Sequence, residues 1–160
     1  MSQVSVLFVC LGNICRSPTA EGVFNNKLIQ ANLNGCIQSG SAGTSDWHIG
    51  SPPDRRTLNA ALTRGYDFSN QRGRQVKVDD FSNFDLVLAM DQENLSHLDL
   101  MKPKGFSGHL GLFLDFAVNS EYSEVPDPYY GGDTGFDLVL DLCESASEGL
   151  IAHIQTSLLS

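Results

Sequence analysis

Short apolar runs alternate along the chain with segments whose apolar positions recur at helical spacing. Residues 4–9 (VSVLFV) and 84–90 (FDLVLAM) are typical of strands buried on both faces of a parallel sheet. Residues 37–42 form a weaker strand candidate, and a further short strand is expected near residues 109–110. The last segment, residues 136–159, has the apolar stripe of an amphipathic helix.

Capping residues predict where the other helices begin and end. Ser17 and Pro18 suit the N-cap and the first helical position of a helix that Asn34-Gly35 ends. Asp54 is expected to cap a helix that runs to about residue 64. Asp91 is expected to cap a helix that runs to about residue 100, so both carboxylates are interpreted as caps rather than catalysts.

Strands that alternate with helices predict an α/β fold with a parallel sheet and right-handed connections. The chain has 160 residues and no internal repeat, low-complexity tract or linker. We therefore expect a single domain that covers residues 1–160.

Charge and cysteine content narrow the possible partners. The formal net charge of -9 disfavours nucleic acid and anionic membranes, so any anion site must be local. The four cysteines form no CxxC pair, no signal peptide is visible and no segment is long enough to span a bilayer. These features favour a cytoplasmic protein in a reducing compartment.

The stretch VLFVCLGNICRSPTAE places a cysteine and an arginine at the two ends of a tight loop before a helix. Such a loop directs backbone N–H groups and the positive end of the helix dipole at one point, which suits a tetrahedral oxyanion. Gly12 and Asn13 tolerate the positive φ angles that this turn is expected to need. Arg16 supplies a planar fork of donors, and Cys10 supplies a nucleophile that Ser17 can stabilise.

A late loop offers the acid that a leaving oxygen would need. Asp127 lies between two prolines in VPDPYY, which stiffen its backbone. Tyr129, Tyr130 and Trp47 could form the walls of a slot for a flat aromatic group. Each of these residues also has an ordinary structural interpretation: a turn aspartate, surface tyrosines, a packing tryptophan and, for Cys10, an inert buried cysteine. The occurrence of all of them together with the Cys10–Arg16 loop disfavours these interpretations.

The motifs VCLGNICRSPTAE, SAGTSDWHIG, GRQV, DLVLAMDQEN and DPYY resemble, in order, those of the low-molecular-weight protein tyrosine phosphatases. The resemblance covers nearly the whole chain. It implies a three-layer α/β fold, with a four-stranded parallel sheet and helices on both faces. It also implies a cysteinyl-phosphate mechanism with Cys10 as nucleophile, Arg16 as phosphate ligand and Asp127 as general acid.

The resemblance assigns further roles around the loop. It gives Ser17 the stabilisation of the thiolate, Asn13 the shape of the loop, and Ser41 the support of Asn13. Cys15 matches a second loop cysteine that forms a protective disulfide with Cys10 under oxidation. Gln71 stands about where many members have a histidine that supports the loop asparagine, which puts that support in doubt. The remaining expected substrate contacts come from the loop itself: Leu11, Gly12, Ile14 and Cys15.

These features predict an enzyme that acts on phosphotyrosine in proteins or peptides, releases inorganic phosphate, and is a monomer. Three alternatives are a phosphotyrosine-binding module without turnover, an arsenate reductase and an arginine-phosphate phosphatase, of which the last two are disfavoured. The reductases need two further cysteines near the middle of the chain, where residues 70–100 contain none. The arginine-phosphate enzymes carry a threonine where this loop has Ile14. The four histidines show no ligand spacing, so neither a metal nor another cofactor is expected.

Overall fold

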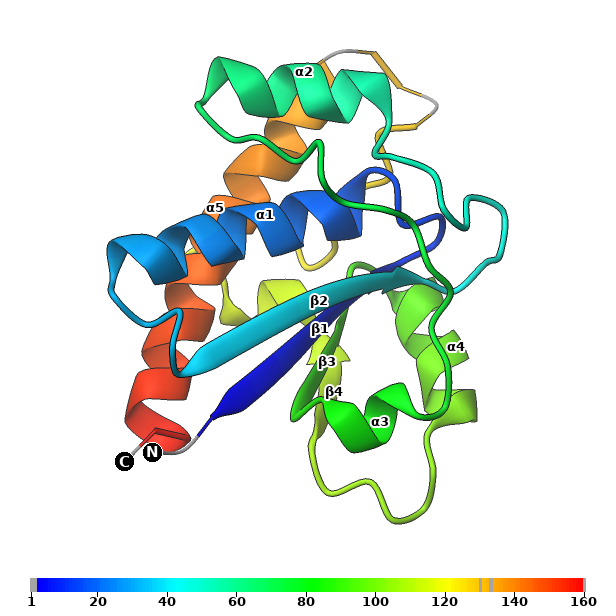
Figure 1. Ribbon diagram of the computed structural model, residues 1–160, viewed down its shortest axis with the longest axis vertical. Coiled ribbons are helices and arrows are strands. Elements are labelled where there is room, and N and C mark those ends of the chain that lie inside the picture. The colour runs from blue at the N-terminus through cyan, green and yellow to red at the C-terminus, as the bar shows by residue number, and fades with distance from the viewer. Residues whose placement is uncertain (1–2, 130, 133, 160) are drawn as a thin grey trace.

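Four parallel strands in the order β2-β1-β3-β4 form the sheet of the computed structural model, which describes residues 3–129, 131–132 and 134–159. This confirms the expected three-layer α/β fold (Figure 1). The strands are β1 (Val4–Cys10), β2 (Ile37–Gly43), β3 (Leu86–Ala89) and β4 (His109–Leu112). The helices are α1 (Arg16–Gln30), α2 (Arg55–Thr63), α3 (Asp80–Asn83), α4 (Gln92–Met101) and α5 (Thr134–Ser157), with a 3-10 turn η1 (Phe113–Phe116).

The central strand β1 divides the core into two halves, because successive side chains of a strand point to opposite faces. Its even-numbered residues pack in one cluster with α1 and α5, whereas Leu7 and Val9 pack in the other, which includes residues of α3 and α4. Figure 1 shows α1 and α5 on one face of the sheet and α3 and α4 on the other. Cys10 belongs to the first cluster, so its side chain is directed toward α1.

Two of the predicted caps are confirmed. Asp54 accepts a hydrogen bond from the Arg56 N–H at the start of α2, and Asp91 accepts one from the Asn94 N–H at the start of α4. In both cases the carboxylate satisfies an N–H group that the first helical turn leaves without a partner.

The predicted boundaries of α1 are wrong. The helix begins at Arg16, after Cys15, and Ser17 does not cap it because the Ser17 hydroxyl points toward the Cys10 sulfur. The helix ends at Gln30 rather than near Asn34, because Asn32 adopts a left-handed conformation with φ 62°. The Leu33 N–H then bonds the Leu28 carbonyl at 2.8 Å, which closes the last turn.

None of the helices in the described part of the chain is long and apolar enough to cross a membrane. Among the same residues, no group of three or more His, Cys, Asp or Glu side chains is placed to hold a metal ion.

Candidate active site

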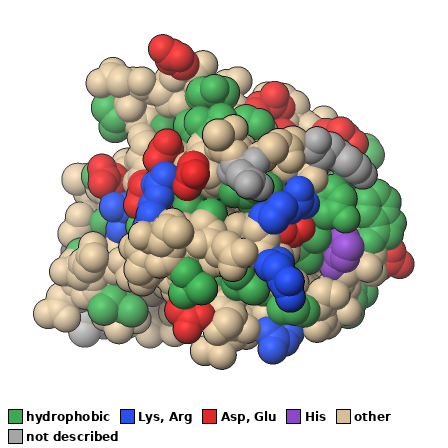
Figure 2. All heavy atoms as spheres, turned by 90° about the horizontal axis from the view of Figure 1, so that it is seen from above, with side chains coloured by type: hydrophobic (Ala, Val, Ile, Leu, Met, Phe, Trp, Pro, Cys, Tyr) green, Lys and Arg blue, Asp and Glu red, His purple; other side chains and the backbone are tan. Residues whose placement is uncertain are grey.

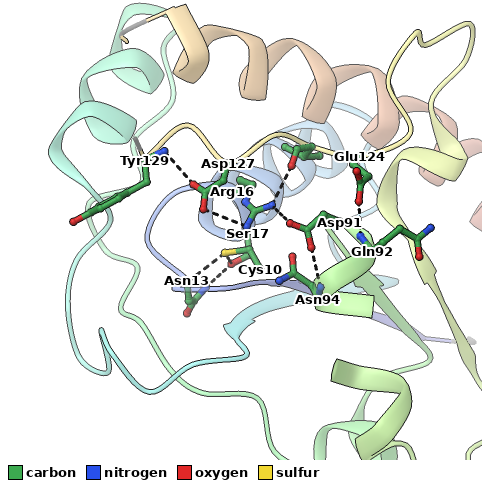
Figure 3. A network of polar contacts seen from close by, with 11 residues as sticks. Cys10, Asn13, Arg16, Ser17, Asp91, Gln92, Asn94, Glu124, Asp127 and Tyr129 are labelled. Carbon is green, nitrogen blue, oxygen red and sulfur yellow. Dashed lines mark hydrogen bonds and ion pairs between the residues drawn. The ribbon is translucent and has the colours of Figure 1, made fainter. Parts of the chain in front are cut away.

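Cys10 is the last residue of β1, and its thiol lies inside the loop that leads to α1. The side chain is 2% exposed. The Asn13 N–H donates to the Cys10 Sγ at 3.2 Å, and the Ser17 Oγ lies 3.1 Å from the same sulfur (Figure 3). The hydrogen bond from the Asn13 N–H stabilises negative charge on the sulfur, and the Ser17 hydroxyl, which also lies 3.3 Å from the Ala42 carbonyl, can add a second one.

Asn13 holds the loop from within. It has a φ of 57°, the left-handed conformation that asparagine tolerates better than most residues. Its Nδ2 donates to the Ser17 Oγ at 2.7 Å and to the Ser41 Oγ at 3.0 Å, while its Oδ1 accepts from the Arg74 N–H at 2.9 Å. The expected contact with Ser41 is therefore confirmed, and it joins the loop to β2.

Gln71, which the sequence offered as a support of Asn13 with that role in doubt, bonds another group. The Gln71 Nε2 donates instead to the Pro18 carbonyl at 2.9 Å, which supports the first turn of α1. The amide of Asn13 is occupied by the two serines and by the Arg74 backbone, so a side chain from position 71 is not needed there.

Two glycines matter here because of close approach rather than backbone conformation. Gly12 was expected to share the positive φ of Asn13, but among the described glycines only Gly50 and Gly65 have one. A Cβ at Gly12 would lie 3.1 Å from the His48 ring, at the wall of the pocket. A Cβ at Gly43 would lie 2.7 Å from the Leu11 carbonyl oxygen. A glycine at the end of β2 therefore lets the loop lie directly against the strand.

The carbonyl groups of the loop are bonded from outside. The N–H groups of Thr44, Ser45 and Asp54 donate to the carbonyls of Cys10, Leu11 and Ile14 at 2.8 to 3.0 Å. Carbonyls turned outward leave the N–H groups of the loop directed toward its interior, where an anion can accept their hydrogen bonds.

Arg16 is 3% exposed and is fixed by partners from distant parts of the chain. Its Nη1 donates to the Asp91 Oδ2 at 2.6 Å and to the Val125 carbonyl at 3.1 Å, and its Nη2 lies 3.6 Å from the Asp127 Oδ2 (Figure 3). Burial alone would lower the pKa of Arg16, but the charges of Cys10, Asp91 and Asp127 raise it above its usual value. The guanidinium therefore stays charged and oriented.

Asp127 lies across the loop from Cys10, on the segment that precedes α5. The Tyr129 N–H donates to its Oδ1 at 3.0 Å, and 35% of its side chain is exposed. Figure 3 shows the Tyr129 ring directed away from the Asp127 carboxylate. Tyr130, the other expected aromatic wall, lies outside the described residues.

A pocket of about 140 Å³ opens above the thiol. Most of the predicted site residues line it: Cys10, Leu11, Gly12, Ile14, Cys15, Arg16, Trp47, Asp127 and Tyr129, joined by His48. Trp47 is 68% exposed, so it is a free wall rather than a core residue. Figure 2 shows the end of the molecule at α2, where Lys and Arg side chains lie among hydrophobic and acidic ones.

The two loop cysteines differ in environment. Burial raises the pKa of the Cys15 thiol to about 12, and nearby Asp54, Cys10 and Asp127 act in the same direction. Cys15 is therefore a neutral thiol at physiological pH. Cys10 differs in its contacts, because the Asn13 N–H donates to its sulfur and the Ser17 Oγ lies 3.1 Å from it.

Three contributors to the site were not predicted from the sequence. Asp91 was interpreted only as a helix cap, yet its second oxygen orients Arg16. Its position directly after a buried strand was a usable signal, since the carboxyl ends of parallel strands meet at one edge of the sheet. Arg74 acts through its backbone N–H and left no side-chain signal. His48 was hidden by its lack of ligand spacing, although it follows Trp47.

Comparison with known proteins gives a consistent result. The family model described as "Low molecular weight phosphotyrosine protein phosphatase" matches residues 5–159. The chain is 42% identical over 153 residues to the low molecular weight protein-tyrosine-phosphatase YfkJ of Bacillus subtilis, covering 96% of this chain and 97% of that protein. It is 43% identical over 135 residues to a low molecular weight phosphotyrosine protein phosphatase of Schizosaccharomyces pombe, covering 84% and 86%.

Solved structures agree with this comparison. A protein tyrosine phosphatase from Entamoeba histolytica superposes with a TM-score of 0.92 at 39% identity, over 96% of this chain and 98% of that one. A Drosophila arginine phosphatase has a TM-score of 0.88 at 29% identity, over 95% and 98%.

Proposed function

The chain belongs to the low molecular weight phosphotyrosine protein phosphatase family and is a protein-tyrosine phosphatase, and we propose that its chemistry proceeds through Cys10, Arg16 and Asp127. The observation that carries this proposal is the placement of the three groups around one pocket. The nucleophile, the cation and the acid all line it, although they come from β1, α1 and a loop more than a hundred residues later.

The reaction divides into two displacements at phosphorus. The Cys10 thiolate forms a bond to the phosphorus of phosphotyrosine while the bond to the tyrosine oxygen breaks, and Asp127 gives that oxygen its proton. Water then attacks the cysteinyl-phosphate, and the Asp127 carboxylate takes a proton from it. The products are inorganic phosphate and the Cys10 thiolate, so each proton and bond is accounted for without a metal or another cofactor.

Arg16 and the backbone of the loop stabilise the charge on the phosphoryl group as it transfers. A guanidinium fork matches two phosphate oxygens, and inward N–H groups serve the others. Asp91 holds the guanidinium in place beforehand, so that little reorganisation is needed during the reaction. The exposed ring of Trp47 and the ring of Tyr129 supply walls for the phenyl group of the substrate.

The proposal is tested by hydrolysis of phosphotyrosine with EDTA present, at mildly acidic and neutral pH. Wild type is expected to turn over, and Cys10→Ser is expected to bind phosphate without turnover. Asp127→Ala is expected to slow release of phenol from phenyl phosphate by about a hundredfold. Its effect should be smaller for p-nitrophenyl phosphate, whose leaving group needs less protonation. Full turnover by Cys10→Ser would refute the covalent mechanism.

The other interpretations have less support. A binding module without turnover would not need an acid beside the thiol, and turnover by wild type would exclude it. An arsenate reductase would need further cysteines, whereas Cys36 and Cys143 are core or near-core residues. The Drosophila relative is named an arginine phosphatase. Enzymes that act on arginine phosphate carry a threonine in this loop, whereas Ile14 gives this pocket no hydroxyl group at that position.

We further propose that oxidation regulates the enzyme through the two loop cysteines. A peroxide could convert the Cys10 and Cys15 thiols to a disulfide, with reduction of the peroxide to water, and so protect the nucleophile from further oxidation. A cytoplasmic location and a monomeric state stay predictions, as do phosphotyrosine proteins or peptides as physiological partners.

A further inference from the structure

Arg56, near the start of α2, lies between two aromatic rings that follow Asp127 in the chain. Its guanidinium carbon is 5.3 Å from the centroid of the Tyr129 ring and 4.7 Å from that of the Phe136 ring. Tyr129 lines the pocket, and Phe136 lies in the first turns of α5. Planar guanidinium groups stack well on aromatic faces, so this contact fixes ring orientation as well as position.

Asp54 holds Arg56 from the other side. The Arg56 Nε and Nη2 donate to the two carboxylate oxygens of Asp54, both at 3.1 Å. This fork sets the plane of the guanidinium and largely neutralises its charge locally, since opposite charges at this distance cancel at longer range. Arg56 therefore acts on its surroundings mainly through stacking, not through a long-range field.

The same residues are attached to the phosphate-binding loop. The Asp54 N–H donates to the Ile14 carbonyl at 2.8 Å, and Phe136 packs in one cluster with Ile14 and Cys15. The loop that contains the nucleophile and the segment that contains the acid thus share α2 as a common support.

A backbone hydrogen bond connects Asp127 to this support. The Tyr129 N–H donates to the Asp127 Oδ1 at 3.0 Å, so displacement of Tyr129 changes the rotamer available to the carboxyl group (Figure 3). Its Oδ2 has a longer contact, 3.6 Å, with Arg16. Because 35% of the Asp127 side chain is exposed, the carboxyl group can change its orientation when these contacts change.

We propose that Arg56 is a positioning residue for the acid step: by stacking between Tyr129 and Phe136 it places Asp127 over the leaving oxygen. This inference rests on the proposed function, in which Asp127 protonates that oxygen. It assigns to an arginine outside the pocket an effect on chemistry that depends on the leaving group. A residue that only stabilised the fold would affect all substrates alike.

The test is kcat/KM for a series of aryl phosphates, from phenyl phosphate to p-nitrophenyl phosphate, with Arg56→Met, Arg56→Lys and Arg55→Met. Arg56→Met keeps much of the apolar volume but removes the planar fork. It is expected to lower kcat/KM for phenyl phosphate by about tenfold and for p-nitrophenyl phosphate by about twofold. The loss on phenyl phosphate is smaller than the whole effect of general acid catalysis because the acid is misplaced and not removed. Arg56→Lys is expected to fall between wild type and Arg56→Met, because lysine keeps the charge without the stacking plane.

Arg55→Met is the matched control. Arg55 is the neighbouring, exposed arginine of the same helix, and it lines a separate groove with Pro52 and Leu58 rather than the active-site pocket. It is expected to leave the dependence on leaving group as in wild type. Thermal unfolding of each variant establishes that it is folded, and a double-mutant cycle of Arg56→Met with Tyr129→Leu is expected to be non-additive on phenyl phosphate.

The outcomes separate the two proposals. A wild type without turnover of any aryl phosphate would overturn the proposed function and this inference together. A wild type that depends on Cys10, with Arg56→Met losing equal activity on every substrate, would overturn only the inference. Additive effects of Arg56→Met and Tyr129→Leu would also overturn it, because they would show that the arginine does not act through the ring.

Discussion

Substitution of Asp91 tests how Arg16 is oriented, because the two carboxylate oxygens of Asp91 bond different groups. Oδ1 accepts from the Asn94 N–H at 2.8 Å and caps α4, and Oδ2 accepts from the Arg16 Nη1 at 2.6 Å. Asp91→Asn keeps the shape and a good capping residue, but it removes the charge that faces a guanidinium 3% exposed. The substitution thus isolates the pairing from the cap.

The magnitude follows from losing a charge-assisted hydrogen bond. The Asn amide has one acceptor oxygen, and while that oxygen keeps the cap, its Nδ2 faces the Arg16 Nη1 as one donor against another. Hydrogen bonds to charged groups contribute about 1.5–3 kcal/mol, so the loss in the free energy of unfolding is about 1.5–3 kcal/mol. It stays below the cost of an unpaired buried charge because Asp127 and the Val125 carbonyl still face Arg16. For a domain of this size, we expect the Tm to fall by about 3–12 °C.

Activity should fall by a similar free energy, because a guanidinium that is less well oriented stabilises the transferring phosphoryl group less. We expect about a ten- to hundredfold loss in kcat/KM for Asp91→Asn, equal for phenyl and p-nitrophenyl phosphate since Asp91 does not serve the leaving oxygen. Asp91→Ala should lose about 0.5–2 kcal/mol more stability through the cap. The measurements are thermal unfolding with and without phosphate and steady-state kinetics. Wild-type kcat/KM in folded Asp91→Asn would refute the view that this pair positions Arg16.

Three further outcomes are expected. Gly43→Ala should lower kcat/KM by more than tenfold with a smaller effect on Tm, because the new Cβ would lie 2.7 Å from the Leu11 carbonyl oxygen and displace the loop; unchanged kinetics would contradict this. Iodoacetamide at neutral pH should alkylate Cys10 before Cys15, whose pKa is raised to about 12, and peptide mass spectrometry reads the order; modification of Cys15 first would contradict the assignment. Burial and a hydrogen bond to a carboxylate raise the pKa of Tyr66 to about 12, so its contribution to stability is present below about pH 10 and is lost as pH rises from 10 toward 12. In Tyr66→Phe the unfolding free energy should therefore fall less steeply between pH 10 and 12. Urea unfolding at several pH values measures this, and the same pH dependence as in wild type would argue against the assignment.

The sequence predicted the buried strands and most helices because their signals are local. The apolar runs at residues 4–9 and 84–90 became β1 and β3, and the caps Asp54 and Asp91 mark the helix starts. Ser17 was misassigned as a helix cap because the dipeptide Ser-Pro does not show where the serine hydroxyl points. In the structure the hydroxyl lies 3.1 Å from the Cys10 sulfur and does not bond the helix.

Roles that depend on partners far apart in the chain were harder to predict. That Gln71 reaches Pro18 rather than Asn13, and that Asp91 orients Arg16, depends on how separate elements pack. A backbone donor such as the Arg74 N–H has no sequence signal at all. The motif residues Cys10 and Arg16 were accessible because they lie in one short loop whose spacing restricts its chemistry.

The partners of Arg16 also determine when this site can exist during synthesis. Its hydrogen bonds reach 75 residues ahead to Asp91 and 109 residues ahead to Val125. A ribosome that has released β1 and α1 has therefore exposed the thiol loop, while the acid and the groups that orient the arginine are not yet translated. Hydrolysis of a phosphate ester by a nascent chain is therefore expected only late in synthesis. It would show that the segment before α5 has packed against the rest of the domain, and not only that the first half has become compact.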